Sequence, residues 1–532
     1  MARERLFLFD TTLRDGAQTN GVDFTLADKL AIAKMLDALG IDYVEGGYPG
    51  ANPLDTEFFA QSPKLDHARF TAFGMTRRAG RSASNDPGLA ALLEAKADAI
   101  CFVAKSWDYH VRIALETTED ENLASIRDSV RAAKTKGREV LLDCEHFFDG
   151  YKANPAYALA CAKAAHAEGA RWVVLCDTNG GTLPHEVEHI VAEVCKIIPG
   201  DRVGIHAHND TEQAVANSFA AVRAGARQIQ GTLNGLGERC GNANLVSIIP
   251  TLKLKPEYAD KFEIGVSDDA LGRIMRMSHG LDELLNRAPD RHAPYVGESA
   301  FATKAGIHAS AIVKEPKTYE HIAPERVGNK RKLLVSDQAG RSNVLAELER
   351  IGLSLDKDDP RVTRLLDEVK EREAIGYAYE AADASFELLA RRMLGQVPHY
   401  FDVEKFDVNV EQRNNAKGER VTVSQAVVKL KVGDEELISV AEGIGPVNAL
   451  DLALRKDLGK YQSFITGLTL TDYRVRILNG GTQAVTRVLI ESTDESGDLW
   501  RTVGVSANII DASFQALMDS IVYKLMKSGA PV

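Results

Sequence analysis

The sequence lacks the features that would assign it to a membrane or to nucleic acid. It has no run of about 18 apolar residues, and the apolar stretch near its start, LFLF, is too short for a signal peptide. No membrane partner is therefore expected, and the cytoplasm is the expected compartment. It also has no basic run with interleaved aromatic residues, and its net charge of -12 repels polyphosphates, so nucleic acid is not an expected partner.

Cysteine is scarce as well. The 6 cysteines show no C-x-x-C spacing and mostly lie in apolar runs, which indicates reduced thiols in a protein core. The composition, 45% hydrophobic and 26% charged, is typical of a globular protein. At 532 residues the chain is too long for one ordinary core, and its length suggests about three domains.

The first half of the chain alternates short apolar runs with segments of helical period. Repeated strand and helix units of this kind are what a (β/α)8 barrel requires, whereas a doubly wound sheet usually has fewer strands and a glycine fingerprint after the first. The runs are LFLFD, YVEGGYP, FTAFGMT, AICFVAKS, EVLLDCEHF, WVVLCDTNG, VGIHAHND and QIQGTLNGLG. The sequence therefore predicts an α/β fold with a catalytic TIM (β/α)8 barrel over residues 1–285.

The second half has two further parts. A single helix is expected over Asp268 to Asn286, followed by a helical middle segment, 286–395, that packs on its own barrel or on that of a neighbour. Residues 396–532 show two rounds of three alternating strands and a helix, which match weakly at a fixed spacing, as Ala449 does with Ala512. This pattern predicts an α+β regulatory or dimerisation domain made of a duplicated βββα unit.

The segment RVGIHAHND carries the clearest chemical signal. Its apolar residues alternate with Gly204, His206 and His208, and alternation is the period of a strand. Both imidazoles therefore leave the same face of one strand, where they form half of a divalent-metal site. A pair of hydrogen-bonded core histidines is the alternative.

Other polar residues fall at or just past the carboxyl end of a predicted strand, which is the active-site face of a TIM barrel. They are Asp10, Arg14, Asp15, Glu45, Thr76, Lys105, Glu145, Asp177, Thr178, His206, His208 and Asn234. Asp15, in DTTLRDG, offers a hard oxygen ligand beside the cation of Arg14. The alternative is that Asp15 only caps a helix and Arg14 lies on the surface. Asn242, in GLGERCGNAN, is a candidate fourth ligand.

A carboxylate, two imidazoles and an amide suit Mn²⁺ or Mg²⁺, with Zn²⁺ or Co²⁺ as alternatives. Such an open site beside Arg14 predicts a 2-oxo acid substrate, whose chelated carbonyl is polarised for attack by a carbon nucleophile. Glu145, in DCEHF, either orients the substrate or a catalytic base, or is an ion-pair partner on the rim.

Taken together, DTTLRDG, HAHND, NGLGERCGNAN, GIH and TYE resemble the motifs of the 2-isopropylmalate, homocitrate and citramalate synthases, which are metal-dependent Claisen-condensing enzymes. The resemblance covers the whole chain, including a C-terminal part similar to their regulatory domain. VEGGYPGANPLDTEFF, AFGMTRR and VAKSWDYH look most like the long bacterial citramalate synthases. It implies that acetyl-CoA and pyruvate are condensed with water to (R)-citramalate and CoA, for isoleucine biosynthesis.

The resemblance also implies roles for particular residues. Those expected to hold the metal are Asp15, His206, His208 and Asn242. Arg14 and Thr178 are expected to contact the 2-oxo acid, with Glu145 at the reacting centre. Three alternatives stay open: a 2-isopropylmalate synthase that takes 2-oxoisovalerate, an acyl-CoA lyase on the same barrel, and a metal-free sensor that binds an amino acid.

In a homodimer, the resemblance implies that His308 and Tyr319 of the partner subunit help deprotonate the acetyl methyl or activate the hydrolytic water. From the residues alone, His308 is a helix-face histidine and Tyr319 is core packing. The sequence departs from many relatives at Thr303, where they carry a second histidine, and at SDQAGRSN (336–343), which replaces a phosphate-like loop.

Two further expectations concern specificity and control. A pocket for pyruvate must exclude the two extra methyl groups of 2-oxoisovalerate, and Met75, Phe102 and Val103 are candidates for the bulk that does so. Isoleucine is the expected feedback ligand, near one turn of the duplicated unit and its counterpart. The residues of this regulatory site are Gly443, Gly445, Pro446 and Asn508.

Overall fold

The structure is a computed structural model that describes residues 3–531 except 305, 334–340, 415 and 479–483. Most of SDQAGRSN therefore lies outside the described residues. The chain divides into two compact units, Met1–Phe301 with Ile322–Arg331, and Ala302–His321 with Lys332–Val532. The boundaries expected near residues 285 and 395 stay predictions. No helix in the described part of the chain is long and apolar enough to cross a membrane.

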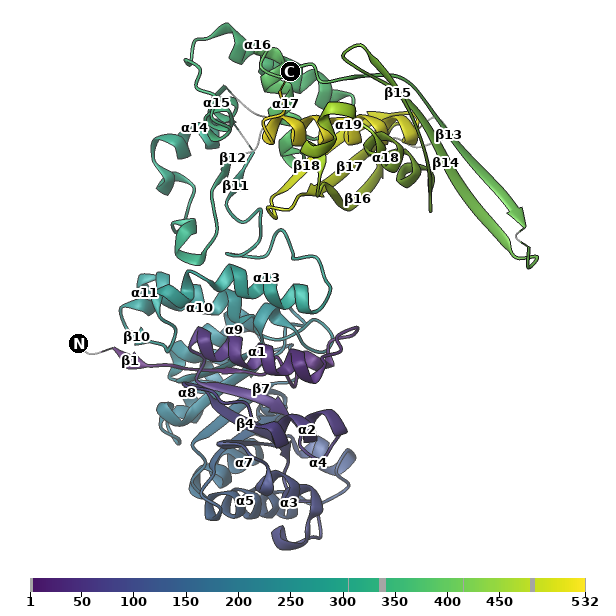
Figure 1. Ribbon diagram of the computed structural model, residues 1–532. Coiled ribbons are helices and arrows are strands. Elements are labelled where there is room, and N and C mark those ends of the chain that lie inside the picture. The colour runs from purple at the N-terminus through teal and green to yellow at the C-terminus, as the bar shows by residue number, and fades with distance from the viewer. Residues whose placement is uncertain (1–2, 305, 334–340, 415, 479–483, 532) are drawn as a thin grey trace. The chain divides into compact units, whose positions relative to one another are not determined.

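The first unit is built on a closed barrel of parallel strands, which confirms the predicted fold class (Figure 1). All eight expected runs form barrel strands, in sequence order, and the first pairs with the last. The strands are β2 (Phe7–Asp10), β3 (Tyr43–Gly47), β4 (Arg69–Met75), β5 (Ala99–Lys105), β6 (Glu139–Glu145), β7 (Trp172–Asp177), β8 (Val203–Ala207) and β9 (Gln228–Gly231). A short parallel pair, β1 (Glu4–Arg5) with β10 (Phe262–Glu263), lies outside the barrel.

Helices connect the strands, and local sequence sets their ends. At the first one, the Thr25 hydroxyl accepts from the Asp28 amide while the Asp28 carboxylate accepts from the Thr25 amide, and Gly40 ends the helix with φ 92°. The helices are α1 (Leu26–Leu39), α2 (Pro53–Gln61), α3 (Pro87–Glu94), α4 (Asp108–Ile113), α5 (Glu119–Thr135), α6 (Phe147–Ala153), α7 (Pro155–Ala167), α8 (Pro184–Cys195), α9 (Ala214–Ala224), α10 (Leu245–Leu254), α11 (Pro256–Ala259), α12 (Asp268–Leu271) and α13 (Ile274–Leu284).

The single helix expected over Asp268 to Asn286 is a wrong prediction, because α12 and α13 are separate helices. Between them the amide of Arg273 bonds to the carbonyl of Ala270, three residues back, which closes a tight turn instead of continuing the α-helix. The apolar period runs through both helices, and only Gly272, which directly follows α12, indicates the break.

The interior of the barrel is packed with large side chains. Phe9, Tyr43 and Trp172 belong to one buried cluster inside the strands, and the Trp172 indole donates to the Tyr43 hydroxyl over 3.1 Å. That hydroxyl in turn lies 2.5 Å from the Glu139 carboxylate. Because side chains fill the barrel interior, the active site is expected at the carboxyl ends of the strands.

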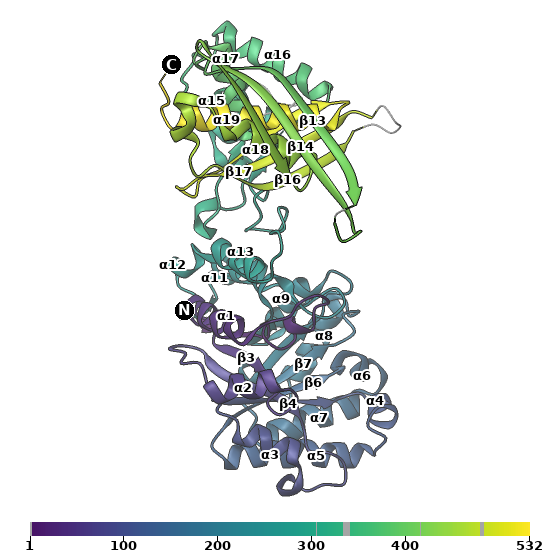
Figure 2. The ribbon, with the colours of Figure 1, turned by 45° about the vertical axis from the view of Figure 1, so that its right-hand side comes forward.

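The second unit contains the duplicated βββα pattern that the sequence predicts (Figure 2). Each round gives one antiparallel sheet and one helix: β13 (Asp402–Asn414), β14 (Arg420–Val432), β15 (Glu435–Gly443) and α18 (Pro446–Lys456), then β16 (Thr469–Ile477), β17 (Thr486–Thr493), β18 (Leu499–Ser506) and α19 (Ile509–Lys527). The two rounds share one hydrophobic core, and the partly buried Phe406 and Phe514 rings that pack against it stack 4.6 Å apart.

The remaining elements of the second unit come from the middle segment. They are β11 (Ala302–Thr303), β12 (Lys332–Leu333), α14 (Gly306–Lys314), α15 (Arg341–Arg350), α16 (Pro360–Ala374) and α17 (Asp383–Met393). Residues of α15, α16 and α17 form a core with Val503 of β18, within the second unit. The expectation that this segment packs on its own barrel or on that of a neighbour stays a prediction. Ile322–Arg331 does belong to the barrel unit.

Candidate metal and substrate site

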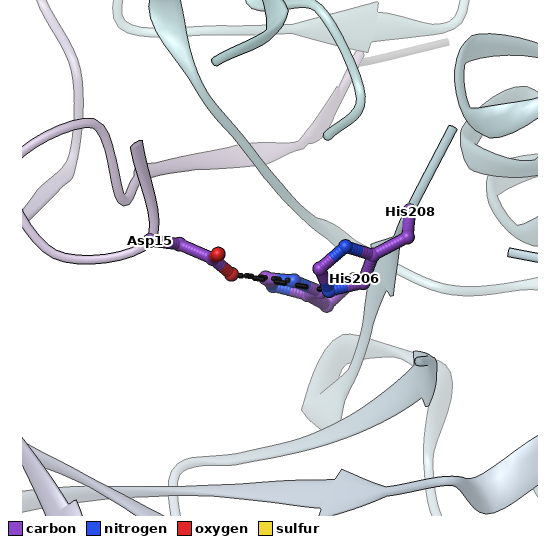
Figure 3. A group of neighbouring side chains, drawn as sticks. All are labelled: Asp15, His206 and His208. Atoms are coloured by element: carbon purple, nitrogen blue, oxygen red, sulfur yellow. Dashed lines mark ion pairs between the residues drawn. The ribbon is translucent and has the colours of Figure 1, made fainter. Parts of the chain in front are cut away.

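Three buried side chains meet at the carboxyl end of the barrel (Figure 3). Asp15 follows β2, His206 lies in β8 and His208 follows that strand directly. One ligand atom from each lies within 4.8 Å of the other two. The Asp15 Oδ2 atom is 3.3 Å from Nε2 of His206 and 3.9 Å from Nε2 of His208, and Figure 3 shows the carboxylate facing both rings. The two imidazoles converge on one point, as the strand period predicts.

The charges of this cluster favour an ionised Asp15. Burial alone would raise its pKa, but Arg14 and the two histidines outweigh burial and hold that pKa below its usual range. Burial also works against protonation of His206, yet Asp15 raises the pKa of that imidazole. The pKa of His208 falls to about 4 through burial and the neighbouring His206, so His208 is uncharged at neutral pH.

Asn242 is buried on the loop that follows β9. Its Nδ2 atom donates to the carbonyl of Leu236 over 3.1 Å, which fixes the amide, and Oδ1 has no hydrogen-bond partner among the described residues. A Cβ atom on Gly237 would lie 2.1 Å from the Asn242 Nδ2 atom, so this loop needs glycine there. Asn242 pairs with His208 in an isolated backbone bridge, and its buried, unsatisfied amide oxygen adds a candidate donor to the His₂Asp set, which fits a divalent cation.

Arg14 is held on three sides. Its Nε atom donates to Glu45 Oε2 over 2.8 Å, its Nη1 atom lies 3.3 Å from Asp15 Oδ2, and its guanidinium carbon lies 3.9 Å from the centre of the Phe73 ring. Glu45 is fully buried and also accepts from the Thr11 hydroxyl. Burial disfavours the charged guanidinium, but Glu45 and Asp15 more than compensate and raise the pKa of Arg14. Arg14 is therefore a permanent cation with a fixed orientation.

Arg14, Asp15, His206 and His208 line a cavity of about 280 Å³. The sequence-predicted residues that it brings together are Arg14, Asp15, Lys105, Glu145, Thr178, His206, His208, Met75 and Val103. Residues that sequence reasoning missed are Gln18, Phe73, Asp143, Cys176, Glu238 and Arg239. Asp143 was open to detection, because it lies two residues before Glu145 on β6 and so shares its face of the strand. Burial raises the Asp143 pKa to about 6.

Two ion pairs shape the rim. Lys105 Nζ lies 2.6 Å from Glu145 Oε2, so Glu145 is an ion-pair partner on the rim, as one of the two interpretations expected. A role for Glu145 in catalysis stays a prediction. Arg239, in a left-handed conformation with φ 56°, makes two bonds to the Asp210 carboxylate, of 2.7 and 2.8 Å. It also donates to the Thr178 carbonyl over 2.8 Å, and so ties the loops after β7, β8 and β9 together.

Several residues that were expected at the active site do not line this cavity and make contacts elsewhere. Asp10 accepts from the amide and hydroxyl of Thr12, and Asp177 accepts from the Thr182 hydroxyl. The Asn234 amide bonds to α13, and Phe102 is enclosed in the hydrophobic core and does not line the cavity. Residues at a strand end can point to the cavity or to the next turn, and the sequence did not distinguish the two.

His308 and Tyr319 belong to the second unit, where their rings lie 4.2 Å apart and are both exposed. They therefore form a neighbouring pair, with no core role for Tyr319, which is 51% exposed. Thr303 lies in β11.

The expected regulatory residues surround the starts of the two equivalent helices of the duplicated unit. Gly445 is the residue before α18 and Pro446 its first residue, while Asn508 caps α19 by accepting from the Ile510 amide over 2.9 Å. Gly443 ends β15, and a Cβ atom there would lie 2.6 Å from the Ala449 amide nitrogen. Their regulatory role stays a prediction.

Comparison with known proteins defines the class. Residues 5–272 match the HMGL-like family, residues 295–376 match the homocitrate synthase post-HMGL domain-like family, and residues 380–525 match the LeuA allosteric (dimerisation) domain. A hydroxymethylglutaryl-CoA lyase structure from Pseudomonas aeruginosa covers 54% of this chain and 95% of its own, with 20% identity and a TM-score of 0.46.

Relatives that match nearly the whole chain identify a group of enzymes within this family. The (R)-citramalate synthase of Aquifex aeolicus is 50% identical over 528 residues, and that of Streptomyces coelicolor is also 50% identical over 528 residues. The matched regions span 98% of this chain, and 98% and 97% of those two proteins. The (R)-citramalate synthase of Sulfolobus acidocaldarius is 44% identical, with 98% of both chains covered. The chain therefore belongs to the HMGL-like family and, within it, to the (R)-citramalate synthases. It is an enzyme, a transferase.

Proposed function

We propose that this chain condenses acetyl-CoA with pyruvate and water to give (R)-citramalate and CoA. The observation that carries the proposal is the convergence of Asp15, His206 and His208 beside Arg14 in one cavity. Three protein ligands leave positions open for a chelating 2-oxo acid, which distinguishes such a site from a closed structural one. The relatives that match nearly the whole chain are (R)-citramalate synthases, which supports the same reaction.

In this proposal Asp15, His206 and His208 hold the divalent cation, with Asn242 as a further ligand. When bound, the cation supplies Lewis acidity that polarises the keto group of the 2-oxo acid. Arg14 binds the substrate carboxylate and balances the negative charge that grows on the former keto oxygen. Its partners Glu45 and Phe73 hold the guanidinium in place for that task, so little reorganisation is needed during the reaction. Thr178 borders the same space and contacts the substrate.

The carbon nucleophile comes from acetyl-CoA. A base removes one proton from the acetyl methyl group. The resulting carbon forms a bond to the keto carbon of pyruvate, the carbonyl π bond opens, and the former keto oxygen takes up a proton to become the hydroxyl of citramalate. Water then cleaves the thioester, which releases CoA as the free thiol and leaves a carboxylate. His308 and Tyr319 of the partner subunit are the proposed groups for proton transfer, and their exposed, adjacent rings suit a role at another surface. Glu145, paired with Lys105, orients the reacting groups from the rim.

The lining of the cavity supports a small acceptor. Met75 and Val103 face it together with the Phe73 ring. In 2-oxoisovalerate two extra methyl groups must fit beside these side chains, whereas pyruvate carries one methyl group. We propose that these three residues favour pyruvate.

Free CoA thiol released from acetyl-CoA, measured with Mn²⁺ or Mg²⁺ present, tests the proposal. Pyruvate, 2-oxobutanoate, 2-oxoisovalerate and 2-oxoglutarate are compared as acceptors, and pyruvate is expected to give the highest kcat/KM. A preference for 2-oxoisovalerate would favour the 2-isopropylmalate synthase alternative. If no CoA thiol is released with any of the four acceptors, the acyl-CoA lyase and the metal-free sensor become the favoured alternatives.

We propose further that the chain works as a homodimer and that isoleucine inhibits it at the C-terminal domain. The match to an allosteric dimerisation domain supports control by this part of the chain. The proposed isoleucine site lies at the starts of α18 and α19, with Gly443, Gly445, Pro446 and Asn508. Inhibition curves for isoleucine, leucine and valine test it, since replacing Asn508 by alanine should weaken inhibition without changing the uninhibited rate. Unchanged inhibition would contradict this location.

A further inference from the structure

Behind the candidate metal site, a buried chain of hydrogen bonds joins His206 to Asp143 through Gln230. The Gln230 Oε1 atom lies 2.9 Å from Nδ1 of His206, and Gln230 Nε2 donates to Asp143 Oδ1 over 3.1 Å. His206 and Gln230 are partners in the register of β8 and β9, which places their side chains next to each other. Gln230 is fully buried, and Asp143, which also lines the cavity, is only 3% exposed.

We propose that Gln230 is a positioning residue for the metal: its amide, oriented by Asp143, keeps a hydrogen on Nδ1 of His206 and thereby directs the lone pair of Nε2 toward Asp15 and His208. The proposal rests on the metal-assisted function proposed above. Neither Gln230 nor Asp143 needs to touch the cation for this role.

The direction of the chain follows from what each group can donate. An ionised carboxylate only accepts hydrogen bonds, so Asp143 turns the NH₂ group of Gln230 toward itself. The carbonyl oxygen of the same amide then faces His206, where it can only accept, so Nδ1 must carry a hydrogen. A neutral imidazole with a hydrogen on Nδ1 has its lone pair on Nε2, the atom that lies 3.3 Å from Asp15 Oδ2.

The opposite arrangement is unfavourable at both ends. If the Gln230 amide turned over, its oxygen would face the Asp143 carboxylate, and two acceptors would meet in a buried site. Its NH₂ group would face Nδ1 of His206, which would favour the ring with its lone pair on the wrong nitrogen. Nδ1 of His208 has no hydrogen-bond partner among the described residues, so the proposed orientation acts through His206.

The same strand provides a matched control. Gln228 lies two residues before Gln230 on β9 and is equally buried, but neither of its side-chain polar atoms has a partner in the described part of the chain. Replacing Gln228 by methionine removes an amide of the same size from the same face of the strand. Because this amide makes no bond to His206, the change leaves the orientation of that ring unaltered.

The test is Mn²⁺ binding to the full-length, metal-stripped protein, with free Mn²⁺ measured by electron paramagnetic resonance. Gln230→Met is expected to weaken binding by about 10- to 100-fold, the range typical of lost partners of metal ligands. Gln228→Met is expected to bind as the unaltered protein does. The double change Gln230→Glu with Asp143→Asn restores binding, because the carboxylate at position 230 accepts from both His206 and the amide at position 143. Thermal unfolding of each metal-free variant verifies folding.

Three results would overturn the proposal: full Mn²⁺ affinity in Gln230→Met, an equal loss in Gln228→Met, or a folded double variant as weak as Gln230→Met. If Gln230→Met does not fold, Asp143→Asn replaces it, since that change frees the Gln230 amide to turn over and should weaken binding relative to the double variant. No Mn²⁺ binding by the unaltered protein would overturn both this proposal and the metal site. A protein that binds Mn²⁺ as described here but forms no citramalate would contradict only the proposed reaction.

Discussion

Replacing Arg14 by lysine keeps the positive charge but removes the geometry that holds it. Arg14 bonds to Glu45 through Nε, approaches Asp15 through Nη1 and stacks on Phe73 with its planar group. A single ammonium group cannot meet all three, because it lacks the planar fork of donors. The loss of one charge-assisted hydrogen bond is worth about 1.5–3 kcal/mol, and the lost cation–π contact about 0.5–1 kcal/mol.

These contributions together amount to about 2–4 kcal/mol, which corresponds to a fall in kcat/KM of roughly 30- to 1,000-fold. The assay is the initial rate of CoA thiol release with pyruvate varied and the metal saturating. Arg131→Lys is the matched control, since Arg131 makes two bonds to the Glu168 carboxylate with 59% of its side chain exposed. It is expected to keep kcat/KM within about twofold. If Arg14→Lys also stays within about twofold, the assignment of Arg14 to the developing charge is wrong.

Three more predictions follow from buried groups. His206→Ala should abolish turnover and Mn²⁺ binding together, and full turnover by this variant after chelation would contradict the metal assignment. Lys29→Met should lower the free energy of unfolding by about 3–5 kcal/mol in urea titrations, because it strands the buried Asp55 carboxylate, 2.5 Å from Nζ. The double change Lys29→Met with Asp55→Leu should cost much less, and equal losses would refute the ion-pair argument. Burial raises the pKa of Asp10 to about 7, so the unfolded state releases that proton first. The free energy of unfolding of the unaltered protein, relative to that of Asp10→Asn, should therefore fall by of order 3 kcal/mol as the pH rises from about 4 to about 7. A difference between the two proteins that does not change with pH would contradict this.

The barrel was predictable because its signals are local and repeated. Each apolar run ends in a polar or glycine-rich turn, so the number of strands, their order and the active-site face could all be deduced from period and spacing. The duplicated βββα unit was predictable for the same reason. The break between α12 and α13 was missed, because the apolar period continues through it and only Gly272 marks it.

The site divides in a similar way. His206 and His208 were predictable from the two-residue period, and Asp15 from its place after the first barrel strand. Asp143 and Gln230 were missed, because their importance depends on which strands are neighbours across the barrel and not on their own sequence context. Phe73 was missed because an aromatic residue in a strand predicts core packing, whereas here its ring supports Arg14. Phe102, by contrast, was expected near the substrate and lies in the core.

The fate of the acetyl carbon tests the central claim most directly. The unaltered enzyme, with Mn²⁺, is given pyruvate and acetyl-CoA labelled with ¹³C in the methyl group, and the products are followed by nuclear magnetic resonance. We predict that the label appears in the methylene group of citramalate, with one molecule of free CoA for each citramalate formed. Label found only in acetate would mean that the thioester is hydrolysed without a new carbon–carbon bond, and would contradict the proposed condensation.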